Sequence, residues 1–358
     1  MNPISVMRRL TKNVPHMIRR EPCFVLTEIL LTYRCTQRCR QCSFPQKADQ
    51  MPAMTLSDFK TIVDRLDEYG THGLVLSGGE ALLHPQLEEC LNYAMSKHFS
   101  YVHILSNLYY SQSKLESFME MIFKHRIAIS CSFDGFDEVA DDIRGAEDVS
   151  KVVMGNMEYL DKENRKRGKP IKTGVNVVIS QLNMHQIPAI LSYLESLRWP
   201  TNVDVYYSSQ RPEGDELKIV DFEGLRSVLE RAKSSPAVIT PKWILDGFID
   251  SFHGKGPKYC PYLLSPSVGS RFFVQPNGDV KVCSGEPIGN LIAQTPQQIV
   301  DSAAWREKLK VFEACAGCWN SCYTLFSKMS RYGVDEVSRS LRLVRYFGGQ
   351  TLERPTAV

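Results

Sequence analysis

Residues 24–42 read FVLTEILLTYRCTQRCRQC, an apolar run that leads directly into three closely spaced cysteines. The apolar part, FVLTEILLT at 24–32, is typical of a buried strand, because it is short and rich in branched side chains. Cys35, Cys39 and Cys42 follow on a polar stretch that we expect to be a loop. The sequence therefore predicts a strand whose carboxyl end carries a cysteine-rich loop.

The alternation of short apolar runs and amphipathic stretches continues to about residue 210. Five more strands are expected at GLVLS (73–77), YVHILSN (101–107), RIAISCSFDG (126–135), KTGVNVVIS (172–180) and NVDVYYS (202–208). Helices separate them; the first begins after Thr55, which precedes Asp58 in a capping pattern, and ends at Gly70. Such βα units fit either a closed eight-stranded barrel or an open one. Because the alternation stops after six strands, the sequence favours an α/β fold with a partial (β/α)6 TIM-like barrel.

Five segments are expected along the chain: a basic amphipathic helix (1–22), the barrel (23–210), a helical linker (211–258), a cysteine-rich unit (259–325) and a C-terminal helix or tail (326–358). The cysteine-rich unit contains SRFFVQPNGDVKVC (270–283), in which Asn277-Gly278 is a favoured hairpin turn. One helix, PQQIVDSAAWREKLKVF (296–312), and the run CAGCWNSC (315–322) follow it. We therefore expect a small C-terminal β-hairpin and helix module held by its cysteines.

Composition narrows the class of protein. The 358 residues carry 43 basic and 40 acidic side chains, a balance that argues against nucleic acid as a partner. No stretch reaches the ~18 apolar residues of a membrane-spanning helix, and the first residues lack the features of a signal peptide. We therefore expect a cytoplasmic protein. The amphipathic helix at 1–22 either packs against the barrel or lies on an anionic membrane surface, and both interpretations stay open.

Eleven cysteines in a reducing compartment point to metal or redox chemistry rather than to disulfides. Cys35, Cys39 and Cys42 lie close together on one loop, so they fit three corners of a cubane cluster and leave the fourth iron open. A structural zinc site needs four ligands and no local fourth is evident, although a distant residue could complete it. One βα unit later, Ser77-Gly78-Gly79-Glu80 closes the next strand at the same end of the sheet. Its glycines allow close backbone approach to a ligand, and its carboxylate is suited to an ammonium group.

Together these motifs resemble the radical S-adenosylmethionine (SAM) superfamily. The resemblance covers roughly residues 24–210 through CTQRCRQC, SGGEALLHP, LSN and SFDG. It implies that Cys35, Cys39 and Cys42 bind a [4Fe–4S] cluster whose open iron is chelated by SAM. It further implies a set of SAM-binding residues at the strand ends: Gly78, Gly79, Glu80, Ser106, Asn107, Ser132, Asp134, Asn176 and Ser180. One departure is Gln41, where the family often has an aromatic residue; Phe44 is the expected substitute.

The remaining cysteines resemble the SPASM/Twitch extension of one branch of this superfamily. Five of them lie in the C-terminal unit: Cys260, Cys283, Cys315, Cys318 and Cys322. The family's two-cluster form uses more cysteines, so the resemblance implies one auxiliary [4Fe–4S] cluster with four ligands drawn from these five. Zinc is the alternative for this unit. We assign no catalytic residue beyond the radical SAM cluster; Cys322 or Cys131 is a candidate hydrogen-atom donor, although Cys131 fits core packing better.

The resemblance implies an enzyme that receives an electron from flavodoxin, ferredoxin or a similar donor and cleaves SAM to a 5′-deoxyadenosyl radical. That radical abstracts a hydrogen atom from the substrate, and the auxiliary cluster assists oxidation or electron transfer. Because about twenty residues precede the expected barrel, we favour a small-molecule substrate such as a sugar, a nucleoside or a lipid-linked intermediate. The alternatives are a peptide maturase and a non-catalytic iron–sulfur or zinc regulatory protein.

Overall fold

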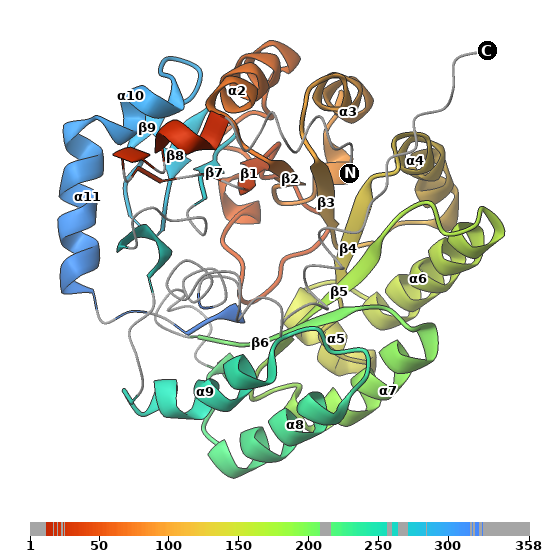
Figure 1. The fold of residues 1–358 in the computed structure, drawn as a ribbon. Coiled ribbons are helices and arrows are strands. Elements are labelled where there is room, and N and C mark those ends of the chain that lie inside the picture. Colours follow the sequence, from red (N-terminus) through yellow and green to blue (C-terminus); the bar gives the residue numbers. More distant parts are fainter. Residues whose placement is uncertain are drawn as a thin grey trace.

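A computed structural model describes residues 12–16, 18–19, 21–22, 24, 26–207, 216–255, 260–263, 271–283, 285–315, 317, 319–321 and 324. Six parallel strands form most of its sheet: β1 (Leu26–Leu30), β2 (Gly73–Ser77), β3 (Tyr101–Ser106), β4 (Ala128–Ser132), β5 (Thr173–Ile179) and β6 (Thr201–Val205). Neighbouring strands pair in chain order from β1 to β6. The curved sheet stays open rather than closing on itself (Figure 1). The prediction of a partial barrel is confirmed.

Helices cover the outer face of the curved sheet (Figure 1). They are α2 (Leu56–Tyr69), α3 (Leu87–Ser96), α4 (Gln112–His125), α5 (Asp137–Arg144), α6 (Val149–Lys166), α7 (Ile187–Leu197), α8 (Phe222–Ser234) and α9 (Lys242–Phe252). As the sequence predicts, α2 begins after Thr55, whose side chain accepts from the Asp58 N–H, and it ends at left-handed Gly70.

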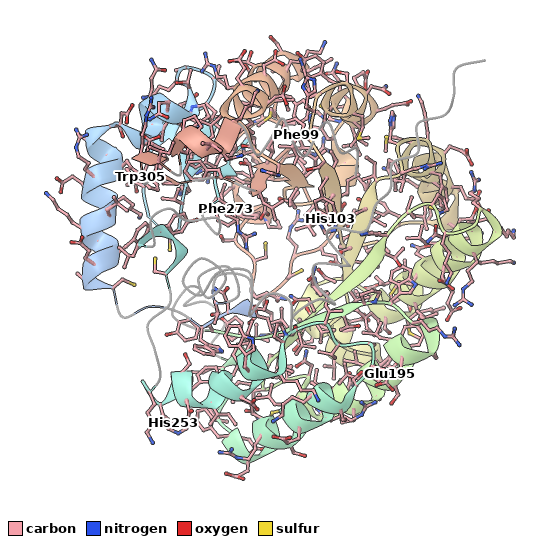
Figure 2. The ribbon with its side chains drawn as sticks, viewed as in Figure 1. Phe99, His103, Glu195, His253, Phe273 and Trp305 are labelled. Carbon is pink, nitrogen blue, oxygen red and sulfur yellow. The ribbon has the colours of Figure 1, made fainter. Side chains whose placement is uncertain are left out.

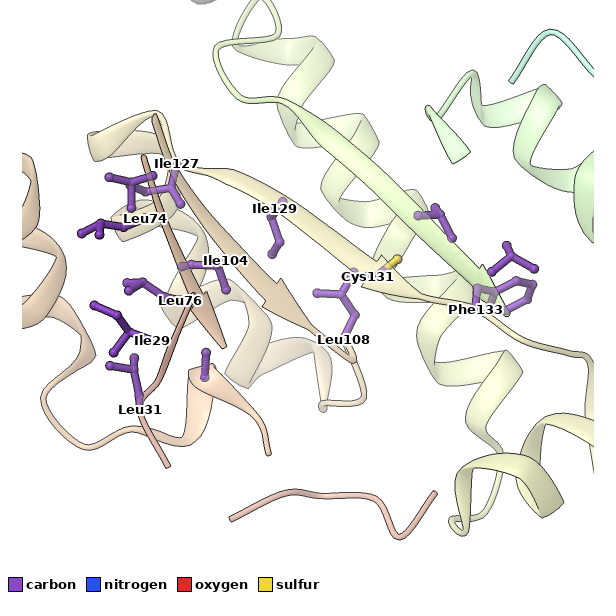
Figure 3. Close-up of a cluster of buried hydrophobic side chains, with 14 of the residues drawn as sticks. Ile29, Leu31, Leu74, Leu76, Ile104, Leu108, Ile127, Ile129, Cys131 and Phe133 are labelled. Carbon is purple, nitrogen blue, oxygen red and sulfur yellow. The ribbon is translucent and has the colours of Figure 1, made fainter. Parts of the chain in front are cut away.

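Side chains alternate between the two faces of each strand. The outer face is apolar and packs under the helices, whereas the inner face is more polar. Ile29, Leu74, Leu76, Ile104 and Ile129 point outward and pack in one hydrophobic cluster under the helices (Figure 3). The inward positions carry polar side chains as well as apolar ones, including Glu28, His103, Ser130, Asn176 and Asp204. The sequence pattern of the strands thus builds both the core and the lumen.

The C-terminal hairpin belongs to the same sheet as the barrel strands. β7 (Phe273–Val274) pairs in parallel with β1, and β8 (Asp279–Lys281) and β9 (Gly289–Asn290) extend the sheet in antiparallel fashion. The free edge of β1 needs hydrogen-bond partners, and the Glu28 N–H donates to the Phe272 carbonyl at 2.9 Å. Phe24 stacks on Phe272 with ring centroids 3.7 Å apart, so the hairpin shares the barrel's core.

The expected helix at 296–312 is two helices, α10 (Pro296–Val300) and α11 (Ala303–Ala314). The break has a local cause: the Ser302 side chain caps α11 by accepting from the Trp305 N–H. The sequence interpretation overlooked this cap because the apolar spacing continues across it.

The N-terminal residues that the structure describes pack on the barrel. Residues 12–16 are helical, and Lys12 and Asn13 donate to carbonyls at the end of α2, Asp67 O at 2.7 Å and Gly70 O at 3.1 Å. The His16 ring lies 4.2 Å from the Tyr69 ring. The rest of the basic segment, residues 1–11, and the tail at 326–358 lie outside the described residues, so membrane contact stays a prediction. Within the described part of the chain, no helix has the length and apolarity needed to cross a bilayer.

Candidate functional site

The cysteine loop follows β1 and lies against the end of α5. Arg38 and Arg40 donate backbone N–H groups to the carbonyls of Arg144 and Ile143, both at 3.0 Å. This close fit depends on Gly145, because a Cβ there would lie 2.4 Å from the Arg38 carbonyl oxygen. The loop is therefore held by backbone hydrogen bonds, which do not involve its cysteine thiols.

Cys35, Cys39 and Cys42 are half-buried and near enough to affect one another's ionisation. Burial raises the pKa of the Cys35 thiol to about 11, and the nearby Glu80, Cys39 and Cys42 raise it further. Among the described residues, no three His, Cys, Asp or Glu side chains converge on a point where one metal ion would bind. Thiols that are close but do not converge suit a cubane, in which each binds a different iron.

Gly78 and Gly79 bring the loop after β2 against the cysteine loop. The Gly79 N–H donates to the Thr32 carbonyl at 2.7 Å, and the Glu80 N–H donates to the Arg34 carbonyl at 2.9 Å. A Cβ on Gly79 would lie 2.4 Å from the Tyr33 carbonyl oxygen. The two glycines are thus needed for the fit of one loop on the other.

The Glu80 carboxylate is fully buried and occupied by backbone donors. It accepts from the Asn107 N–H at 2.7 Å and from the Leu82 N–H at 3.1 Å. Burial raises the pKa of Glu80 to about 7, whereas these N–H donors act in the opposite direction. Asn107 in turn donates its side-chain amide to Thr36 Oγ1 at 2.9 Å and lies 3.6 Å from Cys35 Sγ. Glu80 therefore connects the loop after β3 to the first cysteine.

The Asp134 carboxylate belongs to a second cluster of buried polar groups, which lies beside Cys39. Its carboxylate accepts from the Val178 N–H at 2.8 Å, from the Gln41 amide at 3.4 Å and from the Arg144 guanidinium. Arg144 also lies 3.9 Å from Cys39 Sγ. The sequence interpretation missed Arg144; its position directly before a helix-ending glycine was the available signal. Gln41, noted as a departure from the family pattern, has a defined partner here.

The other expected SAM contacts have different surroundings. Ser106 Oγ accepts from the Leu108 N–H at 3.1 Å, and Ser132 is half-buried at the end of β4. Ser180 bonds Asn183 at the turn after β5 through both its N–H and its hydroxyl. Asn176 lies in the lumen, where its side-chain oxygen accepts from Asn202 at 3.4 Å. The strand ends thus bring Ser106 and Ser132 to the cysteine loop's end of the sheet, and Asn176 is paired in register with Ser132 on the neighbouring strand.

Phe44 stacks on Tyr33, with ring centroids 5.2 Å apart. The Tyr33 hydroxyl donates to Gln275 Oε1 at 2.9 Å, so this stack connects the cysteine loop to the C-terminal hairpin.

A cavity of about 340 Å³ fills the lumen. Its walls are mostly apolar, with polar side chains from both ends of the sheet: Glu28, His103, Ser130, Asn176, Asn202, Asp204, Arg271 and Ser321. His103 points into this interior (Figure 2) and bonds Ser130 Oγ at 2.9 Å through Nε2. Burial lowers the pKa of His103 to about 4, so the imidazole is neutral at physiological pH. The sequence interpretation missed His103, Asn202 and Asp204, because one inward position on a strand resembles another.

Three of the five tail cysteines come together in the described structure. Burial raises the pKa of the Cys260 thiol, and the nearby Cys283 and Cys315 raise it further. Cys318 and Cys322 lie outside the described residues. Cys131 is buried among apolar side chains on the outer face of β4 (Figure 3), which fits the favoured core packing better than a role as a hydrogen-atom donor. For Cys322 that role stays a prediction.

Comparison with known proteins decides the family of the barrel. The model of the radical SAM superfamily matches residues 29–194, the stretch that carries all the loops above except those of the tail. The chain has a radical SAM domain. Its curated relatives include a PqqA peptide cyclase of Bradyrhizobium diazoefficiens, 30% identical over 174 residues, which are 48% of this chain and 42% of the relative. They also include the Fe-coproporphyrin III synthase of Methanosarcina barkeri, 24% identical over 48% of this chain and 41% of the relative.

Solved structures share the fold of the radical SAM domain and its extension. SuiB of Streptococcus suis, solved with its precursor peptide SuiA, superposes with a TM-score of 0.63 over 86% of this chain and 72% of SuiB. The sequences are 13% identical, so the likeness concerns the fold. The matches to the two curated relatives span less than half of each relative's length.

Proposed function

We propose that this chain is a radical SAM enzyme that modifies a peptide. The observation that carries the first part is the loop with Cys35, Cys39 and Cys42, fitted by backbone hydrogen bonds against Gly78 and Gly79. Within the described residues no fourth His, Cys, Asp or Glu completes a single-ion site with them. This donor set fits a [4Fe–4S] cluster with one open iron.

When bound, the cluster and SAM supply a 5′-deoxyadenosyl radical, which abstracts hydrogen from carbon. The chain's residues hold the reactants. Glu80 accepts from the Asn107 N–H, and Asn107 reaches Cys35, so this carboxylate positions the two loops in addition to the contact with the SAM ammonium group that the family resemblance implies. Arg144 places a buried positive charge beside Cys39, where it offsets the negative charge of the thiolates.

The peptide substrate is supported by the relatives, and it replaces the small-molecule expectation. A PqqA peptide cyclase matches 48% of this chain, and SuiB, which was solved with a precursor peptide bound, shares its fold. A lumen cavity of about 340 Å³ is at the small end of ligand pockets, which span about 300–1,000 Å³. It has room for one or two side chains of an extended peptide, with the rest of the peptide outside.

Cys260, Cys283 and Cys315, completed by Cys318 or Cys322, are the proposed ligands of an auxiliary [4Fe–4S] cluster. Its role is to accept an electron from the substrate radical or to pass electrons inward. A flavodoxin or ferredoxin is the proposed external donor.

The test is anaerobic reconstitution followed by reduction with dithionite in the presence of SAM. We expect 5′-deoxyadenosine from the wild type and none from Cys39→Ala. Binding of zinc without iron, or a reconstituted protein that forms no 5′-deoxyadenosine, contradicts the radical SAM assignment.

A second candidate substrate is a small molecule, which the Fe-coproporphyrin III synthase relative favours. Candidate peptides and metabolites that carry deuterium at the reacting carbon separate the two candidates from each other. Deuterium transfer from a peptide into 5′-deoxyadenosine supports the peptide substrate. Transfer only from a deuterated porphyrin or other metabolite supports the second candidate.

A further inference from the structure

The C-terminal cysteine run, residues 315–322, reaches the strand farthest from the hairpin in the sheet. The hairpin pairs with β1 at one end of the open sheet, whereas described residues of the run contact β6 at the other end. Residues 319–321, drawn in blue, lie beside β6 in Figure 1. The C-terminal segment therefore bridges the two ends of the half-barrel.

Ser321 makes the contact with β6 through three hydrogen bonds. Its N–H and its hydroxyl both donate to Asp204 Oδ2, at 3.0 and 2.9 Å, and its hydroxyl oxygen accepts from Asn202 Nδ2 at 3.2 Å. The other Asp204 oxygen accepts from the Val205 N–H at 2.9 Å. Ser321 is buried, only 4% exposed, and Asp204 is half-buried, so water has little access to these bonds.

Trp319 makes an independent contact with α9. Its indole N–H donates to the Ile244 carbonyl at 2.8 Å, and the ring lies directly over Gly247. A Cβ on Gly247 would lie 1.9 Å from Trp319 Cζ2, so this helix position accepts the ring only because it is glycine. Trp319 directly follows Cys318, and Ser321 directly precedes Cys322.

We propose that Asp204 and Ser321 form a latch that holds the C-terminal cysteine run as one wall of the lumen cavity. Ser321, Asn202 and Asp204 all line this cavity, and its opposite wall includes Glu28 of β1. A substrate bound in the cavity then lies against Ser321 of this segment. Asp204 and Ser321 are thus positioning residues. The inference rests on the proposed function for its substrate, but the latch itself is testable without one.

The test measures amide hydrogen exchange by mass spectrometry in anaerobically reconstituted protein, for peptides that contain residues 315–324. Ser321→Ala and Asp204→Asn should exchange about tenfold faster than the wild type, because the first removes the two hydrogen bonds of the hydroxyl and the second weakens the acceptor, and both favour local opening. In Asp204→Asn, either orientation of the amide directs an N–H₂ group at one of the N–H groups that the carboxylate accepts from. Ser321→Thr keeps the hydroxyl and should restore wild-type exchange.

Ser235→Ala is the matched control. Ser235 is also a buried serine that donates to a carboxylate, Glu195, but it lies among α7 and α8. Ser235→Ala should leave amide hydrogen exchange in the peptides of residues 315–324 unchanged. Gly247→Ala, which displaces Trp319 without touching Asp204, should speed exchange in the same peptides. Equal exchange in Ser321→Ala, Asp204→Asn and the wild type overturns the latch.

A spectroscopic readout separates positioning from simple loss of fold. Pulsed electron paramagnetic resonance measures the distance between the two reduced clusters, and we expect a broader distribution in Ser321→Ala and a wild-type one in Ser321→Thr. A narrow, unchanged distribution in Ser321→Ala contradicts the proposal. If the wild type itself forms no 5′-deoxyadenosine, the proposed function fails while hydrogen exchange still decides on the latch.

Discussion

At the scale of single residues, the site is organised by buried polar groups with assigned partners. Glu80 and Asp134 are the two carboxylates beside the cysteine loop, and both are occupied by donors from the chain itself. Arg144 stands between Asp134 and Cys39. A carboxylate that already accepts hydrogen bonds from the chain holds the donating residues in place. This limits which side chains are left to bind SAM.

Arg144→Met should lower the reduction potential of the radical SAM cluster, because it removes a positive charge near the Cys39 thiolate. It also leaves Asp134 buried without its cation, which costs on the order of 3–5 kcal/mol of folding free energy. A redox titration monitored by electron paramagnetic resonance measures the potential, and thermal unfolding measures the stability.

Arg144→Lys keeps the positive charge, so the reduction potential of the cluster should stay close to that of the wild type. Arg40→Met is the control for stability, since Arg40 pairs with Asp142 on the surface, where such pairs contribute about 0–1 kcal/mol. An unchanged potential in Arg144→Met would show that this cation does not affect the cluster.

His103 predicts a pH dependence of stability. The folded pKa is about 4 and the ordinary value is 6.5, so between these pH values the unfolded chain binds a proton that the folded chain does not. Stability therefore falls as pH decreases from 6.5 to 4, by on the order of 2 kcal/mol at pH 5. Glu80 and Asp204, whose raised pKa values are about 7 and about 6, act in the opposite direction.

The comparison of wild type with His103→Gln isolates the histidine, because the two carboxyl groups are present in both proteins. Thermal unfolding from pH 5 to 7.5 should show the wild type losing stability relative to the variant as the pH falls. If the stability curves of the two proteins stayed parallel over this pH range, His103 would take up a proton in the folded state as readily as in the unfolded chain.

At the scale of elements, loops at the carboxyl ends of the strands fit one another through glycine positions. Gly79 permits contact between the β2 loop and the cysteine loop, and Gly145 permits contact between the cysteine loop and α5. The loops carry the chemistry, whereas the strands and helices fix where each loop begins.

Gly79→Ala should reduce 5′-deoxyadenosine formation more than tenfold, because its Cβ forces apart the two loops that Glu80 and Asn107 connect. The assay is the reductive cleavage of SAM described above. Gly155→Ala is the matched control: it lies on exposed α6 with open space at its Cβ, and should stabilise the chain by about 0.5–1 kcal/mol without loss of activity. Full activity in Gly79→Ala would mean that the loops can separate without consequence.

At the scale of the whole molecule, the C-terminal segment extends the open barrel sheet and contacts both β1 and β6. β7 extends the sheet at β1, the Phe24–Phe272 stack joins the two parts of the core, and Ser321 reaches β6. The two cysteine groups are therefore set relative to each other by one continuous sheet.

Phe272→Ala should destabilise the whole chain by about 3–5 kcal/mol, since it opens a cavity in this shared core. Thermal unfolding should show one lowered transition for the barrel and the tail together. Val311→Ala on the exposed face of α11 should change the stability by less than about 0.5 kcal/mol. A separate early transition of the tail, with the barrel unaffected, would contradict the single core.

The sequence by itself determined the six βα units, the cysteine loop after the first strand and the Gly78-Gly79-Glu80 turn after the second. These features are local: periodicity, capping residues and spacing specify them within a few residues of chain. Only the tertiary structure decided that β7 pairs with β1 and that Glu80 accepts a hydrogen bond from the Asn107 N–H. It also decided that Arg144 lies beside Cys39 and that Ser321 donates to Asp204. Each of these is a contact between distant segments, and its partner follows from how strands and helices pack, which no local pattern records.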